Sequence, residues 1–142
     1  MNRLSDVLVT KGKNVFAIRP TDSVYDAMKM MDEKGVGALL VITEEGVAGI
    51  LSERDVARKI TLSGKAPRET AISEIMSHHV TCVAPDLGIH EAMAIMTEQR
   101  VRHLPVISGK QVLGVVSIGD LVKVIIDDQK FTIEQLQNYI TS

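Results

Sequence analysis

Two short segments of the chain carry the same polar residues at the same spacing. Residues 49–55 read Gly-Ile-Leu-Ser-Glu-Arg-Asp, and residues 114–120 read Gly-Val-Val-Ser-Ile-Gly-Asp. In both segments an apolar stretch ends at a serine, and an aspartate follows three positions later. A helix that begins at such a serine places the hydroxyl and the carboxylate together on its first turn. These four polar residues are the strongest candidates for a binding site.

Two interpretations of the Ser–Asp pairs are open. In the structural interpretation, each pair is a helix N-cap with a carboxylate at the third position. In the ligand interpretation, the helix N-terminus and the serine hydroxyl bind a phosphate, and the aspartate accepts hydrogen bonds from two hydroxyls. A phosphate beside a diol describes a ribonucleotide. The recurrence of Gly49 and Gly114 favours the ligand interpretation, because a cap alone does not require a glycine there.

The Ser–Asp pairs belong to an internal repeat. At an offset of 65 positions, residues 20–60 align with residues 85–125 without a gap, and 14 of the 41 pairs are identical. Ordinary residue usage would give roughly two or three identities. A weaker echo precedes each copy, since residues 4–8 (Leu-Ser-Asp-Val-Leu) match residues 72–76 (Ile-Ser-Glu-Ile-Met). The chain therefore holds two copies of one unit.

The same succession of elements is predicted in both copies. Hydrophobic positions recur at helical spacing in one part of each copy, and two apolar runs separated by turn residues indicate a hairpin. The expected elements are a strand at 15–18 and 80–83, a helix from 24 and 89, strands at 36–42 and 101–107 and at 47–51 and 112–116, and a helix from 52 and 117. This β-α-β-β-α order predicts a mixed α/β fold. One copy is too small to be stable alone, so the two should pack together.

Composition and charge exclude several classes of protein. Hydrophobic residues make up 45% and charged residues 24% of the 142 positions, which is typical of a folded globular chain. The net charge of −2 and the absence of basic runs argue against a nucleic-acid binder. No apolar run approaches the ~18 residues of a membrane span. Residues 1–6 lack the apolar core of a signal peptide, so a cytoplasmic location is expected.

The ordered and duplicated pattern resembles the CBS-domain pair, or Bateman module, of the family named after cystathionine β-synthase. The strand, the Gly-apolar-apolar-Ser-x-x-Asp segment and the helix recur, and residues 102–106 (Arg-His-Leu-Pro-Val) are also typical of it. The resemblance covers residues 4–126. It implies two units related by a pseudo-two-fold axis with two clefts between them. In such modules the clefts bind AMP, ADP, ATP and sometimes NAD or S-adenosylmethionine.

The resemblance also implies which residues would contact a nucleotide. Asp55 and Asp120 would hold the ribose, and Ser52 and Ser117 would contribute hydroxyls. The Asp55 cleft would add Ile50, Arg54, Arg58, His79, Val80, Thr81, Val101, Arg102 and His103. The Asp120 cleft would add Asn14, Val15, Phe16, Val36, Gly37, Ala38, Val115 and Gly119. The phosphate partners would be Arg54, Arg58, Arg102 and His103, with Lys11 or Lys13 of the loop as further candidates. Gly37 and Ala38 stand where the second copy has Arg102 and His103, so the two clefts should not be equivalent.

Other candidate sites are weaker. His78 and His79 lack further ligands at a spacing that metals use, so they are interpreted as linker residues. Cys82 is the only cysteine and cannot form an internal disulfide. We therefore predict no metal site and no catalytic residue.

The functional prediction is a regulatory module without enzymatic activity. We expect a stand-alone pair of CBS domains that binds an adenine nucleotide, signals to a separate protein and forms a homodimer. The alternative is a structural or interaction protein with vestigial clefts. The expected boundaries are residues 1–65 for the first unit with its N-terminal segment, 66–126 for the second, and 127–142 for a last helix. That helix is expected to open at a Thr132–Gln135 capping box.

Overall fold

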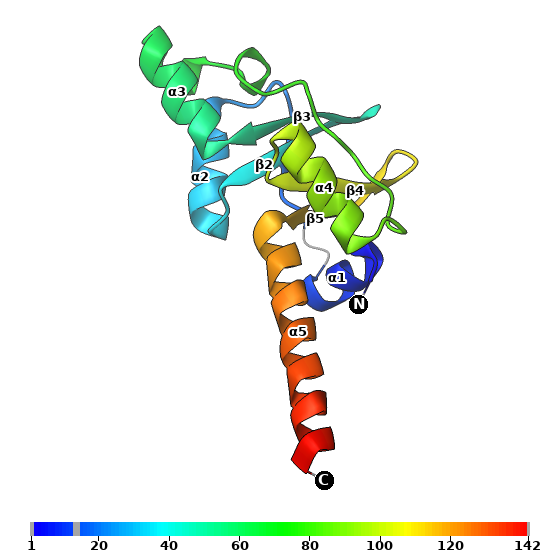
Figure 1. Cartoon of the computed structure of the whole chain (residues 1–142). Coiled ribbons are helices and arrows are strands. Elements are labelled where there is room, and N and C mark those ends of the chain that lie inside the picture. The colour runs from blue at the N-terminus through cyan, green and yellow to red at the C-terminus, as the bar shows by residue number, and fades with distance from the viewer. Residues whose placement is uncertain (1, 13–14, 142) are drawn as a thin grey trace. The chain divides into compact units, whose positions relative to one another are not determined.

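The chain folds into two compact units that each contain one copy of the repeat. The computed structural model describes residues 2–12 and 15–141. Residues 15–81 with 109–112 form one unit, here the first-copy unit. Residues 2–12, 82–108 and 113–141 form the other, the second-copy unit. Both contain helices and short strands (Figure 1), which confirms the predicted mixed α/β class.

The first-copy unit is a small sheet covered by helices. Its elements are β1 (Ala17–Ile18), α2 (Val24–Lys34), β2 (Ala38–Thr43), β3 (Gly46–Ser52), α3 (Glu53–Ser63), and the 3₁₀ turns η1 (Pro67–Glu69) and η2 (Ile72–Glu74). The strand order is β1-β2-β3, with β1 parallel and β3 antiparallel to β2. The predicted hairpin and both predicted helices are confirmed.

Helix α2 shows how local sequence fixes these elements. The Ser23 hydroxyl oxygen accepts a hydrogen bond from the Asp26 N–H at 3.1 Å and so caps the first turn. Gly35 ends the helix in the left-handed conformation, with φ of 64°. The predicted stripe places Val24, Ala27 and Met31 in the core.

The second-copy unit repeats this arrangement with a reduced first strand. Its elements are α1 (Leu4–Lys11), α4 (Ile89–Gln99), β4 (His103–Ser108), β5 (Gln111–Ser117) from residue 113 onward, and α5 (Ile118–Thr141). The strand expected at 80–83 is represented by a single parallel bridge between Val83 and Val106. This bridge occupies the same place in the repeat as the Ile18–Val41 pair of β1 and β2.

The two echo segments are exchanged between the copies. Leu4, Val7 and Leu8 of α1 are buried in the core of the second copy. Ile72, Ile75 and Met76, which precede the second copy in sequence, are buried in the core of the first. The expected boundaries followed the order of the chain and grouped α1 with the first copy and residues 66–81 with the second. In the core packing, each of these segments belongs to the other copy.

Equivalent hydrogen bonds fix both exchanged segments. In each case the segment's backbone pairs with the loop that leads from the proline to the next helix. The bonds are Leu4 N–H to Leu87 C=O (3.0 Å) and Ser5 N–H to Pro85 C=O (2.9 Å) in one unit, and Ile72 N–H to Asp22 C=O (2.9 Å) and Ser73 N–H to Pro20 C=O (3.0 Å) in the other. The repeat is thus preserved in the contacts as well as in the sequence.

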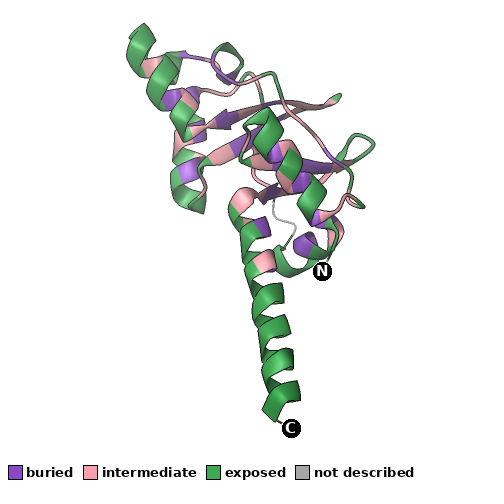
Figure 2. Cartoon of the chain, in the orientation of Figure 1, coloured by how far each residue is buried: buried purple, intermediate pink, exposed green. Residues whose placement is uncertain are grey.

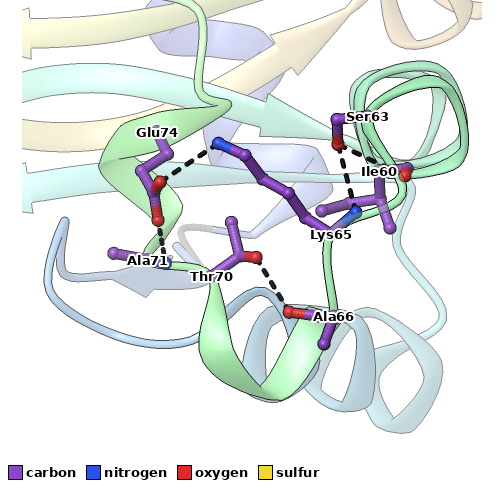
Figure 3. A network of polar contacts seen from close by, with 7 residues as sticks. All are labelled: Ile60, Ser63, Lys65, Ala66, Thr70, Ala71 and Glu74. Atoms are coloured by element: carbon purple, nitrogen blue, oxygen red, sulfur yellow. Dashed lines mark hydrogen bonds and ion pairs between the residues drawn. The ribbon is translucent and has the colours of Figure 1, made fainter.

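Residues 60–74 are held by a polar network (Figure 3). Glu74 accepts hydrogen bonds from the Ala71 N–H at 2.9 Å and from Lys65 Nζ at 3.1 Å. These contacts, the backbone one foremost, lower the pKa of Glu74. The Thr70 hydroxyl, which is buried, donates to the Ala66 carbonyl at 2.8 Å. These contacts fix the conformation of the segment that precedes Ile72, a buried residue of the first-copy core.

Helix α5 is longer than expected. The separate last helix predicted to open at Thr132 is wrong, because α5 runs without interruption from Ile118 to Thr141. The Thr132 hydroxyl donates to the Asp128 carbonyl at 3.0 Å, which is a contact made inside a helix and not at its start. Among helices of the described residues, none combines the length and apolar character that crossing a bilayer requires.

Candidate nucleotide site

The first Ser–Asp pair lies where β3 meets α3. The Ser52 hydroxyl oxygen accepts a hydrogen bond from the Asp55 N–H at 3.1 Å, and Asp55 Oδ2 accepts one from the Ser52 N–H at 3.2 Å. The Ser52 hydroxyl also lies 3.0 Å from Asp55 Oδ2. The pair is therefore a complete capping box, as the structural interpretation predicts. Capping does not exclude ligand binding, because both side chains remain partly accessible.

The second pair forms the same box where β5 meets α5. Asp120 Oδ2 accepts a hydrogen bond from the Ser117 N–H at 2.8 Å, and the Ser117 hydroxyl oxygen accepts one from the Asp120 N–H at 3.1 Å. Among the described residues, this pair has a third partner that the first pair lacks. Lys11, the last residue of α1, places Nζ 2.6 Å from Asp120 Oδ2 and 2.7 Å from the Val115 carbonyl oxygen.

Lys11 stabilises the ionised form of Asp120. Partial burial is the largest influence on the pKa of Asp120 and would raise it. The hydrogen bond and the positive charge of Lys11, together with the Ser117 N–H, outweigh burial and lower the pKa. Asp120 is therefore a carboxylate at neutral pH whose charge is already paired. A cavity of about 180 Å³ opens beside it, lined by Val7, Thr10, Lys11, Asp120, Lys123, Val124, Asp127 and Asp128.

Arg102 and His103 lie beside Asp120 in their own unit. The Arg102 carbonyl accepts a hydrogen bond from the Ile118 N–H at 2.9 Å, on the first turn of α5. Burial, and then the positive charge of Lys11, lowers the pKa of His103, so the imidazole is neutral at pH 7. In this state His103 offers a hydrogen bond to a ligand and not a positive charge. His103 was expected to face Asp55, which belongs to the other unit, and this contact stays a prediction.

Gly37 has the equivalent role in the first-copy unit. Its carbonyl accepts a hydrogen bond from the Glu53 N–H at 3.0 Å, on the first turn of α3. Ile50 pairs with Ser77 in both directions, at 3.0 and 2.9 Å, which starts the segment leading to His79. The partner of Gly37 and the partner of Ile50 therefore both lie in the first-copy unit, as Gly37 and Ile50 themselves do.

The remaining predicted residues fall in both units. Asn14 and Lys13 lie outside the described residues. The first-copy unit holds Val15, Phe16, Val36, Ala38, Arg54, Arg58, His79, Val80 and Thr81, and the second-copy unit holds Val101, Val115 and Gly119. Each expected cleft combines residues of the two units, so its assembly stays a prediction.

The recurrence of the two glycines has a structural cause. A Cβ atom on Gly49 would lie 2.7 Å from the Ser77 carbonyl oxygen, and one on Gly114 would lie 2.6 Å from a Leu8 methyl group. Each glycine thus gives room to the exchanged segment that packs on its strand. The glycines therefore do not distinguish the ligand interpretation from the capping one, because packing accounts for their recurrence.

The position of Lys11 is the feature that sequence reasoning missed. It was expected in a loop, as one of two phosphate partners, whereas it ends α1 and pairs with Asp120. The sequence offers one indication of a special role for this position. The offset of 68 that matches residues 4–8 with 72–76 also matches Lys11 with His79, another residue that can carry a positive charge. At this offset His79 is the sequence counterpart of Lys11, although it lies beyond the turn η2 and not at the end of a helix.

Other cavities and clusters add no chemistry to these sites. A cavity of about 920 Å³ in the first-copy unit lies at the ends of β1 and β2 and is lined by residues 17–22 and 42–45. Burial raises the pKa of the Cys82 thiol, which keeps it protonated at neutral pH. Within residues 2–12 and 15–141, no three His, Cys, Asp or Glu side chains gather as metal ligands would.

Comparison with known families agrees with this architecture. The family model of the CBS domain matches the chain twice, at residues 4–62 and 72–127. The chain belongs to the CBS domain family. Both matches include an echo segment as well as the Ser–Asp pair of the repeat, so the family unit and the internal repeat coincide.

Relatives with this CBS pair occur in plants and bacteria. The mitochondrial CBS domain-containing protein CBSX3 of Arabidopsis thaliana is 37% identical over 146 aligned positions, which cover 96% of this chain and 71% of that protein. A candidate signal-transduction protein with CBS domains from Burkholderia ambifaria is 45% identical, with a TM-score of 0.83 over 89% of this chain and 96% of that one.

A more distant structure shares the fold. The CBS domain pair of the protein MJ0100, solved in complex with 5′-methylthioadenosine and S-adenosyl-L-methionine, has a TM-score of 0.75 at 22% identity. The match covers 87% of this chain and 98% of that one. At this identity the similarity establishes the fold alone.

Proposed function

We propose that this CBS pair is a regulatory module that binds adenine nucleotides at the Ser52–Asp55 and Ser117–Asp120 helix starts and signals to a separate protein. AMP, ADP and ATP are the primary candidate ligands, and NAD is a further one. The observation that carries the proposal is the duplicated helix start, where a hydroxyl and a half-buried carboxylate lie together at a helix N-terminus. The adenosine-containing ligands of the MJ0100 pair support the ligand class.

The chemistry of each start suits a ribonucleotide. A carboxylate fixed by its own helix can accept hydrogen bonds from the two ribose hydroxyls without further ordering. The helix dipole and nearby cations favour phosphate. In the first-copy unit those cations are Arg54 and Arg58, on the first two turns of α3, and in the second-copy unit the cation is Lys11.

The second candidate function is a structural or interaction module without a ligand. One observation favours it: both Ser–Asp pairs are complete capping boxes. The two functions differ in what the carboxylates do. As caps, the aspartates stabilise helices by about 0.3–1 kcal/mol each. As ribose ligands, they would also contribute roughly 1.5–3 kcal/mol to binding.

A thermal-shift screen over AMP, ADP, ATP, NAD, NADH, S-adenosylmethionine and GTP tests the proposal. A ligand that binds only the folded state must raise the melting temperature. We expect adenine nucleotides to stabilise the protein more than GTP, since a pocket that reads the base edge leaves mismatched polar groups unpaired. Equal stabilisation by ATP and GTP would contradict adenine selectivity, and no stabilisation by any ligand would favour the structural function.

The variant Asp55→Asn with Asp120→Asn separates capping from binding. We expect it to fold and to lose nucleotide affinity by about tenfold to a hundredfold per site, since every 1.4 kcal/mol is tenfold. Asp26→Asn is the matched control, because Asp26 occupies the same position after the capping residue Ser23 of α2. The control should lose a similar interaction with the helix dipole, since the described contacts of Asp26 with Ser23 involve only its backbone N–H, and should keep its full response to nucleotide. Unchanged affinity in the double variant would leave the structural function standing.

A further inference from the structure

The second half of α5 is a helix that its own unit leaves uncovered. The buried residues of α5 are Leu121 and Val124, and every described residue from Ile126 onward is exposed. Figure 2 shows this part of the helix exposed along its length. The CBS family match ends at residue 127, so the remainder of α5 lies beyond the family unit. A short helix without tertiary contacts is only marginally stable in water.

An apolar stripe runs along this exposed part. The stripe, here called the α5 seam, consists of Val122, Ile126, Gln129, Ile133, Leu136 and Ile140. The steps between these residues are four, three, four, three and four, which is the a/d spacing of a heptad repeat. Its aliphatic members are 39%, 45%, 53%, 58% and 80% exposed in chain order. The centre of the seam lies roughly 130°, more than a third of a turn, from the middle of the face that buries Leu121 and Val124, because successive helix residues differ by roughly 100°.

We propose that the α5 seam pairs with the same seam of a second copy of this chain to form a parallel two-stranded coiled coil. Three features of the seam support this occupant and this orientation. The proposal does not depend on nucleotide binding, since none of the seam residues belongs to the Ser–Asp sites.

The first feature is the choice of residues at the a and d positions. The a positions are Ile126, Ile133 and Ile140, and the d positions include Leu136. β-Branched residues at a with leucine at d favour two parallel strands. Three strands are favoured instead by isoleucine at both positions.

The second feature is the one polar residue of the seam. In a parallel pair every seam residue faces its own counterpart, so Gln129 meets Gln129 of the second copy. An amide can both donate and accept a hydrogen bond, so this pair satisfies itself and fixes the register. In the antiparallel pairing Gln129 would face Ile133 and leave its amide against an apolar side chain.

The third feature is charge. The seam itself contains no charged residue, so two identical seams do not repel each other. Lys130 flanks the seam at an e position, and in a parallel pair it faces the g position occupied by Ile125. In the antiparallel pair Lys130 would face Lys130, and like charges repel. Charge therefore favours the parallel dimer as well.

The length of the seam sets the strength of the contact. Nineteen residues from Val122 to Ile140 span roughly 28 Å at 1.5 Å per residue. This is fewer than the three or four heptads that make a coiled coil stable by itself. We therefore expect a dimer of the full chain that dissociates at low micromolar concentration.

Sedimentation equilibrium of the full chain, from about 1 to 200 µM, tests the proposal. We expect the mass to rise with concentration from that of the 15.5 kDa chain toward twice that value. Ile133→Asp should shift the midpoint of dimerisation at least tenfold upward. Phe131→Asp is the matched control, because Phe131 is 63% exposed on α5 but lies outside the seam. Melting temperature and circular dichroism confirm that both variants fold, as expected for exposed positions.

Disulfide trapping in a Cys82→Ala background tests the orientation. Gln129→Cys should crosslink rapidly, because equivalent residues meet in a parallel pair, whereas Lys130→Cys should crosslink slowly. Faster trapping at position 130 would overturn the parallel arrangement. A monomer at 200 µM, or a dimer insensitive to Ile133→Asp, would overturn the proposed dimer. A monomer that sediments with phosphatidylcholine–phosphatidylserine vesicles, and loses this binding with Ile133→Asp, would assign the seam to a lipid surface instead.

Discussion

The two copies of the repeat share their backbone contacts but differ in the charge that meets the aspartate. In the second copy, Lys11 pairs with Asp120 at 2.6 Å. In the first copy, the hydrogen bonds described for the Asp55 carboxylate come from the Ser52 N–H and hydroxyl, and the Asp55 N–H donates to the Ser52 hydroxyl oxygen. A duplicated fold has therefore kept the frame of the site and changed its electrostatics. Two ligand sites built on this frame should fill with different dependence on the charge of the ligand.

The largest expected difference between the copies concerns the two glycines. Gly49→Ala should destabilise the protein by about 2–3 kcal/mol, because the new methyl group meets the Ser77 backbone oxygen, which is fixed by its pairing with Ile50. Gly114→Ala should cost only about 1 kcal/mol, because it meets the end of the Leu8 side chain, which can change rotamer. Urea denaturation of both variants measures the difference. Equal losses would show that the Leu8 contact is as rigid as the Ser77 contact.

Lys11→Met should change how the second site responds to phosphate. In the free protein Lys11 neutralises Asp120, so a ribose that takes Asp120 must displace it. A ligand with phosphates can accept the freed ammonium group, and adenosine cannot. We therefore expect the variant to bind adenosine more tightly and to lower the ratio of ATP to adenosine affinity roughly threefold to tenfold, or about 0.7–1.4 kcal/mol. Calorimetry measures both affinities.

Lys123→Met is the control for this variant, because Lys123 lines the same cavity and makes no described bond to Asp120. An unchanged ratio in Lys11→Met, with nucleotide still bound, would show that Lys11 serves only the fold. Absence of nucleotide binding in the unmodified protein would instead count against the proposed function itself.

The helix ends that precede β2 and β4 give a smaller difference of the opposite sign. Gly35 and Arg100 hold equivalent places and both have positive φ, 64° and 55°. Glycine adopts this conformation without strain, and arginine does not. Arg100→Gly should therefore stabilise the protein by about 0.5–1 kcal/mol, measured by thermal or urea unfolding. Arg100→Ala, which keeps a Cβ, should show no such gain, and a gain in both variants would point to the arginine side chain as the cause.

The smallest effect concerns acid titration of Asp120. Because its pKa is lowered in the folded protein, its contribution to stability is present above the ordinary value near ~3.9 and is lost as pH falls through the lowered value. Lys11→Met should raise the folded pKa of Asp120 toward its ordinary value, and so reduce the stability that this carboxylate contributes above that pH. A carbon-13 NMR titration of the carboxyl group measures the pKa. Lys123→Met should leave it closer to that of the unmodified protein, and an equal rise in both variants would contradict the assigned role of Lys11.

Much of the fold was predictable because the same spacing of apolar and turn residues occurs in both copies, so each element predicted in one copy is supported by its counterpart in the other. The hairpins, the two amphipathic helices and the capping serines follow from local spacing, which reports neighbours a few positions away. The exchange of the echo segments was not predictable in this way. It joins Leu4 to Leu87 and Ile72 to Asp22, and periodicity within one segment carries no information on its distant partner.

Two further misses have local causes. Thr132 and Gln135 fit a capping box, but the same residue types occur inside helices, where a threonine hydroxyl bonds back to a carbonyl four positions earlier. The ammonium group of Lys11 reaches a carboxylate more than a hundred positions away, and only the three-dimensional path of α1 brings them together. The Ser–Asp pairs themselves were identified from spacing alone, because both members lie on one helical turn.

The exchange of the echo segments has a consequence for synthesis on the ribosome. All buried members of the first-copy core lie between Ile18 and Met76, so this core can close as soon as that stretch has emerged. The second-copy core takes Leu4, Val7 and Leu8 from the part of the chain made first and its other members from Val83 onward. The apolar face of α1 therefore has none of its native core partners until the first copy has been made and synthesis has passed Val83. During that interval nascent-chain factors have access to a surface that the finished protein hides.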